Sequence, residues 1–200
     1  MKKFGSAIIL AGGKSTRMGF DKQLLKIDRR KLMDSIINKL KSEFEEIIIV
    51  SNRPELYIGL SHKITVDIIK DKGPLGGIHA GLLKSSSKYG FVVACDMPNI
   101  HIDYVKYMKD KITDDSFGCT TKFGDWIEPF SSFYSVDLIG AIEDYLRSNR
   151  RSINGLIDQL KFSYIEEDEA RRFSPNWDMF LNLNTKNDLE SYLESLVWCE

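Results

Sequence analysis

The chain has 200 residues, which is enough for one α/β domain and too few for two domains of usual size. Its net charge of −1 argues against a nucleic-acid-binding protein that works by broad counterion release, because such proteins need an excess of Lys and Arg. The apolar run at residues 7–11 is too short for a secretory signal, and no stretch approaches the ~18–20 apolar residues of a membrane span. A cytoplasmic protein with no membrane or nucleic-acid partner is therefore expected.

The three cysteines are far apart in the sequence, odd in number, and form no CxxC pair; they are Cys95, Cys119 and Cys199. The three histidines have no metal-ligand spacing with them. This pattern argues against a zinc site and favours a reduced cytosolic protein.

Short apolar runs rich in β-branched residues predict strands at residues 6–10, 47–50, 66–69 and 91–94. Each run is uniformly apolar, which is typical of strands that are covered on both faces. Between them, two stripes have helical spacing: Leu32, Ile36, Ile37 and Leu40, and Ile78, Leu82 and Leu83. Strand–helix–strand alternation of this kind predicts an α/β fold of three αβα layers with a mostly parallel central sheet.

The second half of the chain is less regular. Apolar patterns predict strands at 130–134 and 162–165 and helices at 138–146, 153–160 and 185–197. Thr185 can cap the last helix while Asp188 reaches back to its start. No linker or repeat interrupts the chain, so residues 1–200 are expected to form one domain, with a nucleotide-binding half (1–100) and an acceptor-substrate half (101–200).

A glycine-rich, cationic segment follows the first predicted strand directly, at residues 10–22. Paired Gly12 and Gly13 let the backbone turn and bring N–H groups close to phosphate oxygens, and Lys14, Arg17 and Lys22 add positive charge. A triphosphate needs both features. The segment matches neither a Walker loop nor the GxGxxG fingerprint, and the alternative is a connecting turn with solvated cations.

A carboxylate ends the strand at 91–94: the sequence there continues Cys95-Asp96-Met97-Pro98. In open α/β sheets the carboxyl ends of the strands border the ligand crevice, so Asp96 is expected to point towards the glycine-rich segment. A carboxylate there is a natural Mg²⁺ ligand, because Mg²⁺ takes one or two carboxylates and completes its shell with water and phosphates. The alternative is an Asp that caps the next turn.

Three further segments carry weaker signals. Asn52, at the end of the second strand, can hydrogen-bond a base or ribose, although Asn is also a common turn residue. Asp71 and the following Gly73-Pro74-Leu75-Gly76-Gly77 join a strand to a helix whose N-terminus can face an anion, or form a structural turn. Asn182 and Asn184 lie just before the last helix, and capping by Thr185 leaves Asn182 unexplained.

In order along the chain, these segments resemble the molybdenum cofactor guanylyltransferase family, within the nucleotidyltransferases of Rossmann-like fold. The family's opening signature LAGGxSxRMGxDK is matched at residues 10–22 without a gap. GPLGG at 73–77 and CDMP at 95–98 resemble its next two blocks. Residues 128–134 are similar to its EPLxAxY segment, and 180–189 to its FxNxNTxxDL ending. The resemblance therefore covers nearly the whole chain.

The resemblance implies a role for individual residues. Leu10, Ala11 and Gly12 would contact the nucleotide, with Lys22 on its phosphates and Arg17 facing the triphosphate. Asn52 and Asp71 would help to hold the guanosine portion, and Asp96 would bind Mg²⁺, with Mn²⁺ as a substitute. The acceptor side would include Arg150, Arg151, Asn182 and Asn184.

The implied activity is transfer of GMP from GTP to the phosphate of molybdopterin, with release of pyrophosphate. Transient contact with molybdoenzymes or cofactor-insertion proteins is a further expectation. The nearest alternative is a cytidylyltransferase for the same pterin, whose loop usually reads LAAG where this chain has Leu10-Ala11-Gly12-Gly13. The motifs are also compatible with a sugar-phosphate nucleotidyltransferase or with a non-catalytic nucleotide-binding module.

Overall fold

The apolar runs of the first half form the centre of one seven-stranded sheet, in the order β3-β2-β1-β4-β6-β5-β7. The computed structural model describes residues 1–11, 24–57 and 62–197. The strands are β1 (Lys2–Leu10), β2 (Glu46–Val50), β3 (Lys63–Thr65), β4 (Ser87–Ala94), β5 (Gly118–Phe123), β6 (Trp126–Ser135) and β7 (Ser163–Glu166). The helices are α1 (Leu24–Lys41), α2 (Pro74–Lys84), α3 (Ile102–Lys111), α4 (Ile139–Arg147), α5 (Ile153–Ile157), α6 (Glu167–Arg171) and α7 (Lys186–Val197). Three 3₁₀ turns are η1 (Pro54–Tyr57), η2 (Val136–Leu138) and η3 (Asp178–Phe180).

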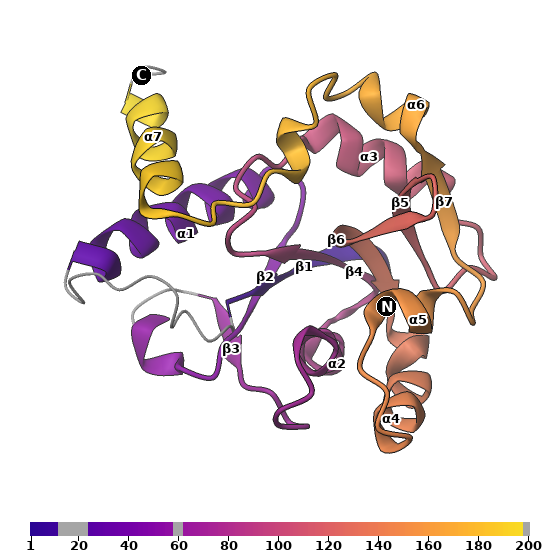
Figure 1. Ribbon diagram of the computed structural model, residues 1–200. Coiled ribbons are helices and arrows are strands. Elements are labelled where there is room, and N and C mark those ends of the chain that lie inside the picture. Colours follow the sequence, from indigo (N-terminus) through magenta and orange to yellow (C-terminus); the bar gives the residue numbers. More distant parts are fainter. Residues whose placement is uncertain (12–23, 58–61, 198–200) are drawn as a thin grey trace.

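Helices cover both faces of the sheet, so the predicted three-layer α/β fold is confirmed (Figure 1). Helices α1, α3, α6 and α7 pack on one face, where Ile9, Phe91 and Phe133 belong to a common buried cluster. Helices α2, α4 and α5 pack on the other face against Ile8 and Val92. Consecutive residues of β1 and β4 thus enter different cores, which explains why these strands are uniformly apolar.

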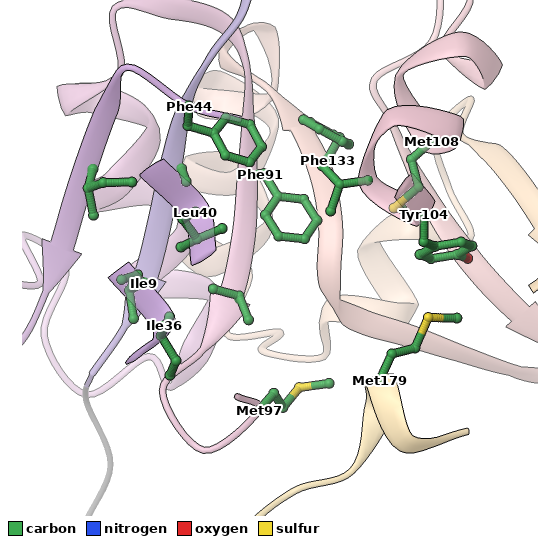
Figure 2. Packing of buried hydrophobic residues seen from close by; sticks show 14 of the residues in the cluster. Ile9, Ile36, Leu40, Phe44, Phe91, Met97, Tyr104, Met108, Phe133 and Met179 are labelled. Carbon is green, nitrogen blue, oxygen red and sulfur yellow. The ribbon is translucent and has the colours of Figure 1, made fainter. Parts of the chain in front are cut away.

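Aromatic rings fill the centre of the α1 face, as Figure 2 shows. The Phe44 and Phe91 rings stack with centroids 5.6 Å apart, and the centroids of Phe91 and Phe133 are 5.1 Å apart. Ile36 and Leu40 of α1 are completely buried beside them. This packing joins α1 and β4, from the first half of the chain, to β6 from the second half.

The sheet is mostly parallel, with one reversal at β6. Strand β1 pairs in parallel with β2 and β4, while β6 runs antiparallel to both β4 and β5. The reversal follows from the tight turn at Gly124 and Asp125, since Phe123 pairs directly with Trp126 and Gly124 has φ +55°. One sheet therefore continues through both halves of the chain.

Two predicted elements are wrong in place or length. The strand predicted at 66–69 is β3, Lys63–Thr65, and Val66 and Ile68 beyond it are exposed. The helix predicted at 153–160 ends at Ile157 in α5. The strand was predicted too far along the chain because Val66 and Ile68 are apolar but do not pair with the sheet. Periodicity alone cannot tell a covered strand from an exposed connection. The cap of the last helix is as predicted: the Asp188 N–H donates to Thr185 Oγ1 at 3.1 Å, and the Thr185 N–H donates to Asp188 Oδ2 at 2.8 Å.

Gly118 provides a test of the packing between β5 and β6. A β carbon at this position would lie 2.1 Å from the carbonyl oxygen of Phe133 and 2.6 Å from Cε1 of Phe162. Gly118→Ala should therefore lower the free energy of unfolding by about 1–3 kcal/mol, as overpacked cores do. Gly140→Ala is the matched control, because a β carbon there would meet nothing within 4 Å, and alanine in helix α4 should stabilise by up to about 1 kcal/mol. Urea titration measures both changes, and equal stabilities for the two variants would contradict the close approach.

Candidate functional site

The candidate site lies where β1, β2 and β4 end side by side. Leu10 pairs with Val50 on one side and with Ala94 on the other. Two further backbone bonds continue the ladder: the Ala11 N–H donates to the Val50 carbonyl at 2.8 Å, and the Cys95 N–H donates to the Leu10 carbonyl at 3.1 Å. The chain thus leaves β1 between the ends of β2 and β4, at the edge where open α/β sheets bind ligands.

Part of the predicted nucleotide site lies outside the described residues. Gly12, Gly13, Arg17 and Lys22 belong to that part, so their phosphate contacts stay predictions. Leu10 is buried at the end of β1, and Ala11 is half-buried and leads into the segment. The structure therefore describes the chain up to Ala11, and the phosphate loop after it stays a prediction.

Asp96 lies two residues beyond β4 and next to the end of β1. Its residue is half-buried, and its carbonyl oxygen accepts a 2.8 Å hydrogen bond from the Leu183 N–H. Burial raises the pKa of the Asp96 carboxyl, against a lowering effect of a backbone hydrogen bond. Asp96 is therefore a partly desolvated acid at the carboxyl edge of the sheet.

Glu128 is a second acid at this edge, and sequence reasoning assigned it no role. It is only 3% exposed, and its Oε1 accepts a 3.0 Å hydrogen bond from the Phe130 N–H. Burial, and to a smaller extent the charge of Asp96, raise its pKa to about 7, although the Phe130 N–H acts in the opposite direction. The available signal was a single acidic residue inside the apolar segment that forms β6, because buried acids are rare without a partner.

An irregular bend in β6 holds Glu128 in place. Thr121 pairs with Glu128 and Cys119 with Phe133, so the four residues 129–132 stand opposite Thr120 alone. The Thr120 and Ser132 hydroxyls donate to the Glu128 carbonyl at 2.5 and 2.8 Å, and the Tyr134 hydroxyl donates to the Pro129 carbonyl at 2.6 Å. Ser131, inside the bend, has φ +55°, an uncommon conformation for a residue with a β carbon. The buried hydroxyls therefore fix a strained segment at the site.

Asp96 lies close enough to Glu128 for its charge to raise the pKa of Glu128, and we call these two acids the carboxylate pair. Within residues 1–11, 24–57 and 62–197, neither takes part in an ion pair. No cluster of three or more His, Cys, Asp or Glu suited to a metal ion occurs in that same part of the chain. Burial raises the pKa of both acids, and the charge of Asp96 adds to the rise at Glu128, so a cation would favour their charged forms; the oxygen-only donor set fits Mg²⁺.

Asn52 lies on the β2 side of the site and is engaged with Asp67. Its side-chain N–H donates to Asp67 Oδ2 at 2.8 Å, and its Oδ1 accepts from the Asp67 N–H at 3.3 Å. This double contact fixes the turn after β2 against the segment after β3. Asp67 had no predicted role, because its partner is 15 residues away in the chain. Asp71 is exposed, with φ +60°, and lies just before α2.

The four predicted acceptor-side residues come from two different places. The segment of Asn182 and Asn184 lies against Asp96 through the Leu183 N–H, and the Asn184 side chain donates to the Asn182 carbonyl at 3.3 Å. Arg150 and Arg151 follow α4, which packs on the opposite face of the sheet. The Arg150 guanidinium donates to Ser148 Oγ and Gln159 Oε1 and lies 4.2 Å from the Tyr145 ring centroid. The structure thus ties Leu183, which lies between the two asparagines, to Asp96, and leaves the Arg150 side chain bound to its own turn.

The sequence of the chain, compared with known families, matches the model of the MobA-like NTP transferase domain over residues 7–162. The chain belongs to this family. A probable molybdenum cofactor guanylyltransferase from Peptoclostridium acidaminophilum is 51% identical over 197 residues, which cover 96% of this chain and 89% of that protein. A molybdenum cofactor guanylyltransferase from Syntrophotalea carbinolica is also 51% identical, over 95% of this chain and 91% of its own length.

The fold of this MobA-like domain also recurs in solved structures. Molybdopterin-guanine dinucleotide biosynthesis protein A from Archaeoglobus fulgidus superposes with a TM-score of 0.77 over 96% of this chain and 98% of that one, at 22% identity. That likeness establishes the nucleotidyltransferase fold. Among the helices that the structure describes, none has the length and apolar character needed to cross a membrane.

The raised pKa of Glu128 in the MobA-like domain predicts a change of stability with pH. The folded protein keeps the Glu128 proton up to about pH 7, while the unfolded chain loses it near the ordinary value of 4.5. The folded state thus binds more protons between these values, so this residue makes the protein less stable as pH rises through that window.

Without metal and with a chelator present, Glu128→Gln should gain stability relative to wild type between about pH 5 and pH 8. Denaturant titrations at several pH values measure this difference, and exposed Glu194→Gln is the control. A Glu128→Gln difference that stays constant with pH would show that the acid is not buried as described.

Proposed function

We propose that this chain transfers GMP from GTP to the terminal phosphate of molybdopterin and releases pyrophosphate, in a reaction that depends on Mg²⁺. The observation that carries the proposal is the 51% identity, over 96% and 95% of the chain, to two proteins named as molybdenum cofactor guanylyltransferases. The meeting of Asp96, Glu128 and the end of β1 at one edge supports it chemically. The cytoplasm is the proposed compartment, and the buried thiol of Cys119 suits a reducing environment.

The proposed reaction needs placement and charge compensation more than acid–base chemistry. The phosphate of the acceptor is already ionised at neutral pH and attacks the α-phosphorus of GTP in line. The bond to the β,γ-pyrophosphate breaks as the new phosphoanhydride forms. Lys22, Arg17 and the amides around Gly12 and Gly13 are proposed to bind the departing pyrophosphate. No general base is required, so no catalytic His or Cys is proposed.

Asp96 is the proposed ligand of Mg²⁺, and Glu128 is a second acid whose charged form a cation bound there would favour. When bound, Mg²⁺ would neutralise charge on the triphosphate oxygens. The carbonyl of Asp96 is tied to Leu183, and Glu128 is fixed by the hydrogen-bonded bend of β6, so both acids belong to rigid surroundings. Rigid placement matters here because a preorganised charge needs no rearrangement during the reaction.

The nucleotide is proposed to lie on the β2 side of Asp96. Leu10 and Ala11 lead into the predicted phosphate loop, and Asn52 and Asp71 are proposed to contact the guanosine. The Asn52–Asp67 contact supports this placement because it orients polar groups at the end of β2. CTP is the alternative substrate, and the adjacent glycines Gly12 and Gly13 favour the larger purine.

A substrate comparison tests the proposed activity. Incubation with molybdopterin and Mg²⁺ should yield the guanine dinucleotide of the pterin with GTP and little product with CTP, as measured by mass spectrometry and pyrophosphate release. A cytidylyltransferase would show the reverse preference. Pyrophosphate release without any pterin, or nucleotide binding without product, would contradict guanylyl transfer to molybdopterin.

Asp96→Asn tests the metal assignment, because it removes the charge and keeps the size of the side chain. The rate of guanylyl transfer should fall on the order of 10²-fold or more, by analogy with the loss of one preorganised stabiliser. Binding of Mn²⁺ in the presence of GTP, followed by electron paramagnetic resonance, should weaken in parallel. Asp110→Asn, an exposed change in α3, is the matched control. Full activity and unchanged Mn²⁺ binding in Asp96→Asn would rule out Asp96 as the ligand.

A further inference from the structure

Four aromatic side chains gather near the β5–β6 turn, outside the carboxylate pair. The Phe123 ring stacks on Trp126 with centroids 4.9 Å apart, and it meets Trp177 edge-on at 4.2 Å and Phe180 at 5.5 Å. The rings of Trp177 and Phe180 are themselves 5.4 Å apart. We call Phe123, Trp126, Trp177 and Phe180 the aromatic platform. Each ring touches at least one other, so the platform is a rigid unit.

The platform leaves one large ring open to solvent. Trp126 is 50% exposed, and Leu181, which follows Phe180, is 53% exposed. The other indole, Trp177, is half-buried, since Phe123 meets it on one side and the Arg171 guanidinium lies 4.3 Å from its ring centroid. Trp126 is therefore the ring of the platform that can accept another flat molecule. Trp126 and Leu181 are thus two large apolar side chains that the fold leaves half-exposed next to the platform.

Backbone strain helps to build the platform. Trp177 has φ +64°, a left-handed conformation that bulky residues rarely adopt. Hydrogen bonds hold it there: the Trp177 N–H donates to the Ser174 carbonyl at 3.0 Å, and the Phe180 N–H donates to the Trp177 carbonyl at 2.9 Å. Strained residues of this kind cluster at functional sites, and Ser131 at the neighbouring bend is a second example.

The platform lies at the same edge and on the same face of the sheet as Glu128. Trp126 and Glu128 are two residues apart in β6, so their side chains share a face about 6–7 Å apart along the strand. The chain that follows Phe180 reaches Asp96 within three residues, where the Leu183 N–H donates to the Asp96 carbonyl. In Figure 1 this segment, between α6 and α7, passes across the layer that contains α3 and α1. A ligand on Trp126 can thus extend along β6 to the carboxylate pair.

The order of the strands separates the platform from the nucleotide. Strand β2, which is followed by Asn52, lies on one side of β1 and β4, and strands β6 and β5 lie on the other. If GTP occupies the β1–β2 side, the β5–β6 side remains for the acceptor. The proposed acceptor has a pterin, whose pyrimidine half is flat, at one end and a phosphate at the other, which matches an aromatic surface at one end of the path and the proposed metal site at the other.

We propose that the aromatic platform is the subsite for the pterin ring of the acceptor, with Trp126 stacking on that ring. This inference rests on the proposed function. It locates the acceptor on β5, β6 and the segment that leads to Asn182, on the α3 side of the sheet. The Arg150 turn, on the α4 side, is not needed for the stacking contact.

The test compares three substitutions of Trp126, with KM for molybdopterin as the main readout. Trp126→Leu keeps an apolar side chain and removes the flat ring, Trp126→Ala removes both, and Trp126→Phe keeps a smaller ring. Loss of one stacking aromatic typically weakens the binding of a flat base by about 10-fold or more. The KM for molybdopterin should rise by about that factor in Trp126→Leu and Trp126→Ala and much less in Trp126→Phe. The KM for GTP should not change.

Two controls make the result specific. Leu83→Ala removes another exposed apolar side chain, on α2, and should leave both KM values at the wild-type level. Thermal unfolding of each variant checks that the hairpin has not been lost. The fluorescent probe 6-carboxypterin, which lacks the phosphate, measures ring binding in the absence of turnover, and its affinity should fall in Trp126→Leu.

The outcomes separate the subsite from the activity. A Trp126→Leu variant with the wild-type KM for molybdopterin would show that the platform does not bind the pterin, and it would leave the proposed guanylyl transfer unaffected. The same result is expected if Trp126 contacts a partner protein. If the wild-type protein forms no guanylylated pterin, the proposed function fails. In that event, weaker binding of 6-carboxypterin by Trp126→Leu supports the platform as a pterin site, and unchanged binding overturns it.

Discussion

The site depends on the close meeting of β1 and β4 at their carboxyl ends. Both strands are covered on two faces, and they leave the two cores at this edge. The Cys95 N–H continues the ladder to Leu10, and the next residue, Asp96, is held partly out of water. A carboxylate in that position is destabilised by desolvation and is stabilised by any cation that a triphosphate brings with it. Burial against the core thus makes cation binding favourable for the Asp96 carboxylate.

The reversal of β6 supplies the other half of the site. Parallel strands present their ends at the carboxyl edge, whereas β6, being antiparallel, presents its start. The turn at Gly124 therefore brings Trp126 and Glu128 to the edge where Asp96 lies. The bend at 129–132 then interrupts the pairing with β5, and Thr120, Ser132 and Tyr134 satisfy the freed backbone carbonyls. The need to satisfy these backbone carbonyls explains why hydroxyl side chains are buried in this region.

The two faces of the sheet contribute differently to the site. The contact with Asn52 holds Asp67 at the end of β2, on the proposed nucleotide side, and η3 with its flanking residues carries Trp177 and Leu183 on the proposed acceptor side. Asp71 and Trp177, in these connections, and Ser131, in the bend of β6, have left-handed backbone conformations. All three lie where regular pairing or helix geometry is interrupted, which agrees with a rigid scaffold whose irregular segments hold the functional groups.

Some of the site was predictable because its signal is local. The covered strands β1, β2 and β4, the carboxylate after β4 and the cap of α7 each follow from a few consecutive residues. Glu128, Asp67 and the aromatic platform were not predicted, because each acquires its meaning from a partner far along the chain. The residues around Glu128 in the sequence do not indicate that Asp96, 32 residues earlier, acts on its pKa. Likewise, the contact between Phe123 and Trp177 depends on η3 folding back onto β5.

The sequence by itself determined the layered α/β fold, the family and the reaction class, since burial patterns and an ordered series of motifs can be read along the chain. Tertiary structure alone decided which acids share an environment and which aromatic rings form one surface. It also divided the predicted acceptor residues: the segment of Asn182 and Asn184 contacts Asp96 through Leu183, and Arg150 follows a helix on the opposite face. The physical reason is that desolvation, mutual repulsion of charges and ring stacking depend on distances in space, which strand order and a single reversal set.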